Sequence, residues 1–224
     1  MTCGGFAIVA VIGSLASALE AGAGEPVALC NGRDLNGWVQ RGGKARYAVE
    51  NGEIVGHATP GTPNSFLCTA RSYTNFVLEL EFLPQEGLNS GIQVRSECHD
   101  ATKRVMANGR TNTIPAGRVH GYQVEIDPSA RAWTGGIFDE GRRGWLVDLK
   151  TNEAARAAFK PGAWNVLRIE CLDDRIRTWL NGVPAADLRD GLTPSGFIAL
   201  QVHGIGKRTN ELSVRWRNVR VQER

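Results

Sequence analysis

The chain has 224 residues with a formal net charge of +3, and 22% of its residues are charged. This length suits one domain with a sizeable core. Lys and Arg are spread along the chain without a basic block, which argues against a nucleic-acid partner. Six tryptophans fit an ordinary globular domain or a sugar-binding one.

The first predicted element is an apolar leader. The run FAIVAVIGSLASAL is followed by small residues ending in Ala21-Gly22-Ala23, a pattern typical of a signal peptide cleaved near Ala23. The run is short for a membrane span, but no Lys or Arg precedes it, so a membrane anchor or a buried strand is the alternative. We predict a leader over residues 1–23, a single domain over residues 24–224, and export to the periplasm or the extracellular space. No stable membrane insertion is expected after the leader is removed.

Four cysteines remain beyond the leader: Cys30, Cys68, Cys98 and Cys171. An exported chain meets an oxidising compartment, where disulfides form. Four cysteines allow three pairings, and their spacing does not choose among them. Buried free thiols are the alternative.

Short apolar runs alternate with turn signals through the rest of the chain. The segment FVLELEFLP, residues 76–84, alternates strictly and predicts a strand. The pairs Asn51-Gly52 and Asn181-Gly182 are hairpin-turn signals. This pattern predicts an all-β fold, a sandwich of two antiparallel sheets.

Two segments depart from the strand pattern. TNEAARAAF, residues 151–159, predicts one short helix with Thr151 as its N-cap. The polar segment 101–117 has no clear periodicity, and we expect a long loop of the kind that often carries function.

Three strands share one design: SGIQVRSE, HGYQVEID and FIALQVHG. Each has an apolar face, and its other face carries a Gln two residues before an ionisable group, which is Arg95, Glu125 or His203. Neighbouring strands lie about 4.8 Å apart, so in adjacent strands these groups and Asp127 would converge. They could supply a base, a charge stabiliser and an acid or metal ligand. The alternative is an ordinary solvated sheet face.

The turn after the second of these strands contains DEGRRGW, residues 139–145. It is either a salt-bridged turn or a rim that grips a polar ligand through arginine forks. His120, at the start of the Glu125 strand, has the parity of the apolar face.

Seven segments in this order resemble one known family: LCNGRDLNGW, FVLELEFLPQEGLNSGIQVRSE, HGYQVEID, TGGIFDEGRRGW, PGAWNVLRIECLDDRIRTWLNGVPAADL, GFIALQVHG and VRWRNVRV. Together they resemble the 3-keto-disaccharide hydrolase family of bacterial secreted proteins, over nearly all of the chain from Val27. The resemblance implies a concanavalin A-like jelly roll of two curved antiparallel sheets that binds sugars on its concave sheet. It also implies cleavage of glycosides already oxidised at C3, by a 1,2-elimination with or without hydration.

The resemblance and the polar rows together give an expected catalytic set. Glu125 or His203 would remove the C2 proton, and Arg95 or a bound divalent metal ion would stabilise the enolate. Asp127 would orient Arg95 or ligate the metal, whose identity is open. The expected substrate-binding residues are Asn89, Gln93, His120, Gln123, Asp127, Asp139, Arg142, Trp145 and Gln201.

Two other functions compete with this one. A non-catalytic lectin-like module would use Trp133 and Trp145 as a platform for a sugar and would need no tuned base. Convergence of Glu125, Arg95 and His203 in one pocket would favour the enzyme. An endo-glucanase of this fold ranks lowest, because no second Glu stands three residues after Asp127.

Overall fold

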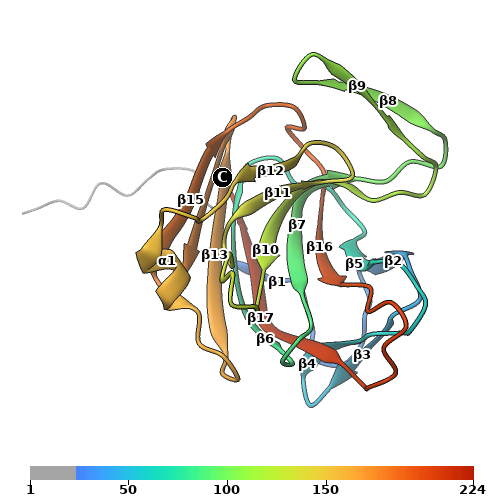
Figure 1. Ribbon diagram of the computed structural model, residues 1–224, viewed down its shortest axis with the longest axis vertical. Coiled ribbons are helices and arrows are strands. Elements are labelled where there is room, and N and C mark those ends of the chain that lie inside the picture. Colours follow the sequence, from blue (N-terminus) through green and yellow to red (C-terminus); the bar gives the residue numbers. More distant parts are fainter. Residues whose placement is uncertain (1–23) are drawn as a thin grey trace, which may run out of the picture.

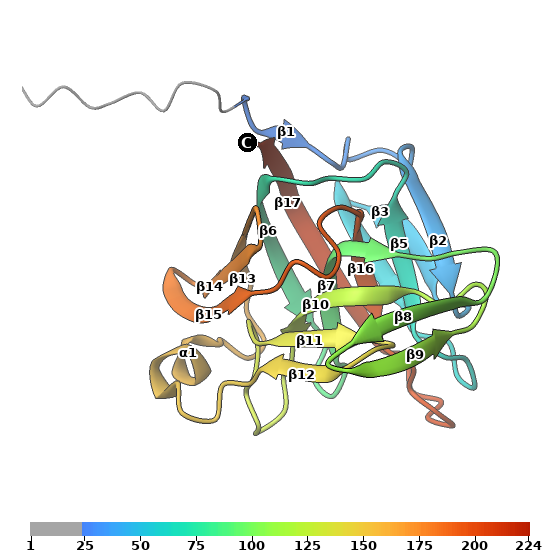
Figure 2. The same cartoon turned by 90° about the horizontal axis from the view of Figure 1, so that it is seen from above.

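The computed structural model describes residues 24–224, which form two antiparallel β-sheets packed face to face (Figures 1 and 2). The expected all-β sandwich with one short helix is confirmed. The predicted leader over residues 1–23 lies outside the described residues. Within residues 24–224, no helix is long and apolar enough to cross a membrane.

The first sheet is built around the long strand β17, which is flanked by β6 and β4. The short strand β1 (Val27–Ala28) also pairs with β17. The strand order is β15 (Val183–Arg189), β14 (Arg175–Leu180), β13 (Asn165–Leu172), β6 (Phe76–Pro84), β17 (Ser213–Glu223), β4 (Glu53–His57) and β3 (Arg46–Glu50).

The second sheet has the three polar-row strands at its centre, with β7 between β10 and β16. Gln93 of β7 pairs with Gln123 of β10 on one side and with Ala199 of β16 on the other. The predicted adjacency of these strands is therefore present. The strand order is β12 (Gly144–Val147), β11 (Ile137–Glu140), β10 (His120–Ile126), β7 (Ser90–Glu97), β16 (Phe197–Val202), β5 (Ser65–Thr69) and β2 (Trp38–Gly42).

The main core lies between the two sheets. The alternating residues Phe76, Leu78, Leu80 and Phe82 of β6 are each at most 1% exposed, as their periodicity predicts. They belong to one cluster with the apolar residues of β7, β10 and β16. Each such side chain contributes about 1.5–3 kcal/mol through burial. This packing leaves the polar rows on the opposite face of the second sheet.

Asn-Gly pairs form the predicted turns and one that was missed. Asn51-Gly52 and Asn181-Gly182 both have positive φ at each residue, as a type I′ hairpin turn requires. Asn108-Gly109 has the same geometry and joins β8 (Lys103–Ala107) to β9 (Arg110–Ile114). The expected loop over residues 101–117 is thus wrong. It contains a hairpin that projects from the sandwich (Figure 1), and most of its residues are exposed on both faces, so no alternation marks its strands.

The single helix, α1 (Glu153–Ala158), is capped by Asn152, not by Thr151 as expected. Asn152 Oδ1 accepts a hydrogen bond from the Ala155 backbone N–H at 3.1 Å. The Asn152 amide also donates to the Pro184 and Ala185 carbonyls, which fixes α1 against β15. Asn152 therefore caps the helix and also attaches it to the first sheet.

Cys30, Cys68, Cys98 and Cys171 are all free thiols. Cys68 and Cys171 are buried, while Cys30 and Cys98 are partly exposed. The alternative of free thiols therefore holds among the described residues.

Candidate functional site

A cavity of about 520 Å³ lies on the polar face of the second sheet. Its volume is within the usual range for small-molecule sites. Six predicted site residues line it: Asn89, Gln123, Glu125, Trp145, Gln201 and His203. The remaining lining residues are Asn64, Arg118, Arg131, Phe138, Glu140 and Gly141.

Glu125 is the most enclosed carboxylate of the cavity, with 5% of its surface exposed. Its Oε1 accepts hydrogen bonds from Asn89 Nδ2 at 2.8 Å and from Arg131 Nη2 at 3.3 Å. Its Oε2 accepts from Gln123 Nε2 at 2.8 Å. Three donors from three segments therefore hold the carboxylate in one orientation.

The glutamines of the polar rows form a hydrogen-bonded chain beneath the cavity. Gln93 and Gln201 both donate to Gln123 Oε1, at 2.7 and 2.8 Å, which directs the Gln123 amide N–H toward Glu125. Gln93 is fully buried and supports Gln123 from below. The glycine at position 91 leaves room for the Gln123 side chain, because a Cβ there would lie 2.6 Å from Gln123 Cδ.

Glu125 and Asp127 have opposite pKa shifts although only one residue separates them. Burial raises the pKa of Glu125, and the hydrogen bonds from Asn89 and Gln123 oppose this only in part. Burial also acts to raise the pKa of Asp127, but hydrogen bonds from Ser129 and Arg131 outweigh it and lower the pKa. Carboxylates with diverging pKa values are typical of a site that assigns them different tasks.

Arg131 is the main cavity residue that the sequence reasoning missed. Its Nε donates to Asp127 Oδ2 at 2.7 Å, and its guanidinium lies over the rings of Trp133 and Trp145, at 4.7 and 5.1 Å from their centroids. Asp127 thus orients Arg131, whereas the sequence led us to expect that it would orient Arg95. Arg131 lies in the loop after β10, where no strand periodicity marks its direction.

Aromatic rings and an imidazole complete the cavity wall. Trp145 meets Phe138 edge to face, with ring centroids 5.3 Å apart, and both line the cavity. His203 follows β16, is exposed, and has Nδ1 2.8 Å from the Gly204 carbonyl oxygen. The cavity therefore offers apolar ring surface beside hydrogen-bonding groups, as sugar recognition requires.

Arg118 and Glu140 form a second ion pair in the cavity, with Nη2 and Oε1 2.5 Å apart. Arg118 also lines a neighbouring hollow of about 500 Å³, and Asn64 is shared in the same way. The walls of that hollow include Phe66, Val119 and Pro115. The polar cavity therefore continues into a more apolar one.

Arg95 does not enter the cavity, which corrects the expectation from alternation. It adopts a left-handed φ of +46°, and its guanidinium donates to the Thr74 and Asp173 carbonyls and to Asn75 Oδ1. The register of β7 with β16 shifts between Gln93 and Ser96, the stretch that contains Arg95, so simple alternation fails there. Arg95 is fully buried and ties β7 to the other sheet.

Asp139 and Arg142 also lie away from the cavity. Asp139 pairs in register with Tyr122, whose ring is in the core, so Asp139 faces inward and is fully buried. It accepts hydrogen bonds from Arg142 Nε at 2.7 Å and from Arg143 Nε at 2.5 Å. The salt-bridged turn, which was the alternative to a ligand rim, describes these two residues. Three other residues of DEGRRGW line the cavity: Glu140, Gly141 and Trp145.

His120 is fully buried at the opposite end of β10 from Glu125, near Glu97 and His99, and does not line this cavity. Its expected role in substrate binding has no support in this position. The expected metal ligand Asp127 is also a poor fit, because its two oxygens already accept from Ser129, Arg131 and the Trp133 backbone. Among residues 24–224, Glu125 belongs to no group of three or more His, Cys, Asp or Glu residues whose ligand atoms all lie within 4.8 Å of one another.

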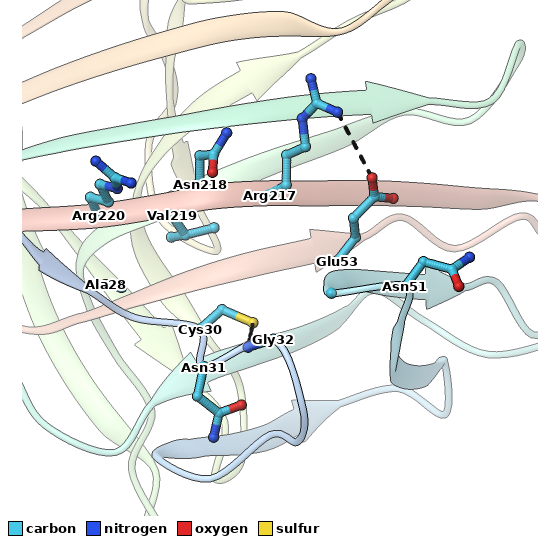
Figure 3. A pocket seen from close by; sticks show the side chains of 11 residues that line it. Ala28, Cys30, Asn31, Gly32, Asn51, Glu53, Arg217, Asn218, Val219 and Arg220 are labelled. Carbon is cyan, nitrogen blue, oxygen red and sulfur yellow. Dashed lines mark hydrogen bonds and ion pairs between the residues drawn. The ribbon is translucent and has the colours of Figure 1, made fainter.

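A separate hollow of about 550 Å³ lies beside β17 on the first sheet (Figure 3). Its carboxylate, Glu53, is paired with Arg215 at 2.6 Å and with Arg217 at 3.9 Å. Figure 3 shows Arg217 and Glu53 on adjacent strands, facing each other across the rim. Because this carboxylate is neutralised by two arginines, the hollow is a weaker candidate for acid–base chemistry than the Glu125 cavity.

Solved structures share this fold at low sequence identity. A Parabacteroides distasonis protein, described provisionally as a glycosyl hydrolase, aligns with a TM-score of 0.54 and 18% identity over 89% of this chain and 94% of its own. The carbohydrate-binding module CBM66 of Bacillus subtilis aligns with a TM-score of 0.54 and 17% identity over 82% and 93%. A Bacillus subtilis protein of unknown function with a galectin-like fold aligns with a TM-score of 0.58 and 11% identity over 84% of this chain and 90% of its own. No curated protein matches the chain.

The described residues form a lectin-like sandwich with a carboxylate, amides and aromatic rings around one cavity. The model of the 3-keto-alpha-glucoside-1,2-lyase-like domain matches residues 25–222. The chain belongs to this family, as the ordered sequence segments predicted.

Proposed function

We propose that the protein cleaves 3-keto-glycosides by C2 proton abstraction and 1,2-elimination, and that Glu125 is the base. The observation that carries this proposal is the buried Glu125 carboxylate, held by three donors in a cavity that also contains Arg131 and His203. The substrate is an oxidised glycoside or oligosaccharide, which the chain would meet after export.

The first step uses the acidity that a C3 ketone gives to the C2 proton. The C2–H bond breaks, the Glu125 carboxylate takes the proton, and the electron pair forms an enolate over C2 and C3. Burial raises the pKa of Glu125, which makes its carboxylate a stronger base once ionised. Asp127, whose pKa is lowered, remains ionised and holds Arg131.

The enolate oxygen needs a positive or hydrogen-bonding partner. Arg131 takes the role first expected for Arg95, because its guanidinium lines the cavity and is fixed by Asp127 and two tryptophans. The enolate then collapses: the C3 ketone returns, a C1–C2 double bond forms, and the C1–O bond breaks. His203, which also lines the cavity, would donate the proton to the departing oxygen.

Replacement of Glu125 by Gln tests the proposal. We expect turnover of a 3-keto-glucoside to fall at least 100-fold, because proton transfer by a positioned base contributes about 10²–10⁴-fold. In the wild type, activity should fall as the pH decreases through the raised pKa of Glu125, since only its ionised form accepts the proton. Product formation is followed by the absorbance of the conjugated ketone and by mass spectrometry.

The control is Glu53→Gln, because Glu53 is a paired carboxylate in the hollow on the other sheet. It should retain wild-type turnover. A substrate deuterated at C2 should react more slowly than the unlabelled one. Undiminished turnover in folded Glu125→Gln would show that the base is another group.

The second candidate function is a carbohydrate-binding module without catalysis. The Phe138 and Trp145 rings on the cavity wall favour it, since aromatic faces bind sugars without a tuned base. Under this alternative, 3-keto-glucosides and unoxidised glucosides would bind by calorimetry, and neither would be cleaved with or without chelator.

A further inference from the structure

A second group of polar side chains lies at the other end of β7 and β10 from Glu125. Glu97 ends β7, His99 follows it, and His120 begins β10 directly opposite Glu97. One potential ligand atom from each of these three residues lies within 4.8 Å of the others. Among residues 24–224, no other group of three or more His, Cys, Asp or Glu residues has this geometry.

A bulge in the strand pairing creates this arrangement. The register between β7 and β10 shifts between His120 and Tyr122, which places His120 beside Glu97. Gly121 has a φ of +138°, and a Cβ there would lie 2.4 Å from Ser96 Oγ. Glycine is therefore required at the point where the strand turns His120 toward Glu97.

His120 lacks the partners that a buried imidazole needs. It is 0% exposed, and neither ring nitrogen has a hydrogen-bond partner. His99 Nε2 also makes no hydrogen bond, and it lies 3.5 Å from Glu97 Oε2. A buried polar group without a hydrogen-bond partner costs about 1–3 kcal/mol of folding free energy. A ligand that pairs with these ring nitrogens would therefore stabilise the protein.

The charges around His120 are largely balanced. Arg142 is the nearby cation that acts most strongly on His120. Arg142 is itself balanced by Asp139 at 2.7 Å. Glu97 supplies the negative charge, and the other nearby cation, Lys103, is exposed to solvent.

We propose that Glu97, His99 and His120 bind a divalent transition-metal ion, with Zn²⁺ as the best fit. Two imidazoles and one carboxylate are a zinc-type donor set that leaves a fourth position for water, whereas Ca²⁺ and Mg²⁺ prefer oxygen donors. Tetrahedral zinc holds its ligand atoms roughly 3.4 Å apart. The cluster therefore contracts on binding, which the partly exposed Glu97 and His99 side chains permit.

This site is distinct from the Glu125 cavity, whose walls come from other residues. Cys98, which lies between two of the ligands in sequence, packs instead with Phe66, Cys68 and Val119. The ion is thus bound by histidine and carboxylate, and its presence is independent of the elimination reaction.

The test is zinc binding to the full chain without a polyhistidine tag, after treatment with chelator. Titration calorimetry with ZnCl₂ should give one site per chain, and Co²⁺ should give the visible spectrum of a low-coordinate complex. We expect His99→Ala and Glu97→Gln to weaken zinc binding about 100-fold or more, because losing a direct ligand exceeds the 10–100-fold cost of losing an outer-shell partner.

The matched controls are His57→Ala and Glu50→Gln, which alter another histidine–carboxylate pair, 2.9 Å apart. These variants and Cys98→Ser should bind zinc like the wild type. Thermal melts establish that each variant is folded, and zinc should raise the Tm of the wild type but not that of His99→Ala. Absence of a wild-type zinc site, or wild-type affinity in both ligand variants, overturns the proposal.

Discussion

Glu125 and Asp127 show how partners determine the chemistry of a side chain. Glu125 lies in β10 and Asp127 just after its end, and both are at most 5% exposed. Asp127 accepts from Ser129 through both backbone and side chain and from the Arg131 guanidinium, so its charge is well compensated. Glu125 has two neutral amide donors and a longer contact to Arg131, so burial dominates its pKa.

Arg131 couples the two carboxylates, and its removal should change the pH profile. In Arg131→Met, we expect turnover of a 3-keto-glucoside to fall about 100-fold, as for loss of a donor to a developing oxyanion. The acid limb should also move to higher pH, because the Arg131 charge lowers the pKa of Glu125 and activity requires ionised Glu125. The measurement is kcat/KM against pH, with Arg131→Lys as the control that retains charge. An unmoved acid limb would contradict this coupling.

The sequence predicts this site in part, for reasons visible at particular residues. Gln123, Glu125 and Gln201 were found because they alternate with core residues on regular strands. Arg131, Arg118 and Asn64 were missed because they come from loops or turns, where no period gives a side-chain direction. Arg95 and Asp139 were misplaced, the first by a left-handed residue and the second by its pairing with Tyr122.

At the scale of the element, strands were predictable wherever one face is buried. β6 follows its alternation throughout, but β8 and β9 are exposed on both faces and show no pattern. Their Asn108-Gly109 turn was the available signal. β7 is regular up to Val94, and the side chain of the next residue, Arg95, connects the two sheets.

Arg95 should therefore be a structural residue of β7. In Arg95→Ala, the free energy of unfolding should fall by about 3 kcal/mol, because the Thr74 and Asp173 carbonyls lose a charged donor. Turnover per folded molecule should stay near the wild-type value. Arg95→Gly should be about 1 kcal/mol more stable than Arg95→Ala, since glycine relieves the left-handed φ. Urea denaturation measures both, and a stable Arg95→Ala with lost activity would restore Arg95 to the catalytic set.

The whole molecule depends on one apolar layer, which is packed between the two sheets. β6 and β17 of one sheet and β7, β10 and β16 of the other contribute to the same cluster. The strand pattern of the sequence predicted that there are two sheets. It did not predict the order of the strands, because that order depends on long-range pairings such as β6 with β17, which local periodicity does not encode. Unfolding of this layer is expected to be cooperative.

The free thiols provide a probe of that cooperativity. Burial raises the pKa values of Cys68 and Cys171 to about 12, and each is at most 1% exposed, so neither presents a reactive thiolate in the native state. We expect iodoacetamide to label Cys30 and Cys98 in native buffer, and Cys68 and Cys171 only in urea. Because Cys171 lies between the sheets and Cys68 on the opposite face of the second sheet, their labelling should share one urea midpoint if the sandwich unfolds as a unit. Peptide mass spectrometry resolves the four sites, and labelling of Cys68 well before Cys171 would show that the second sheet opens separately.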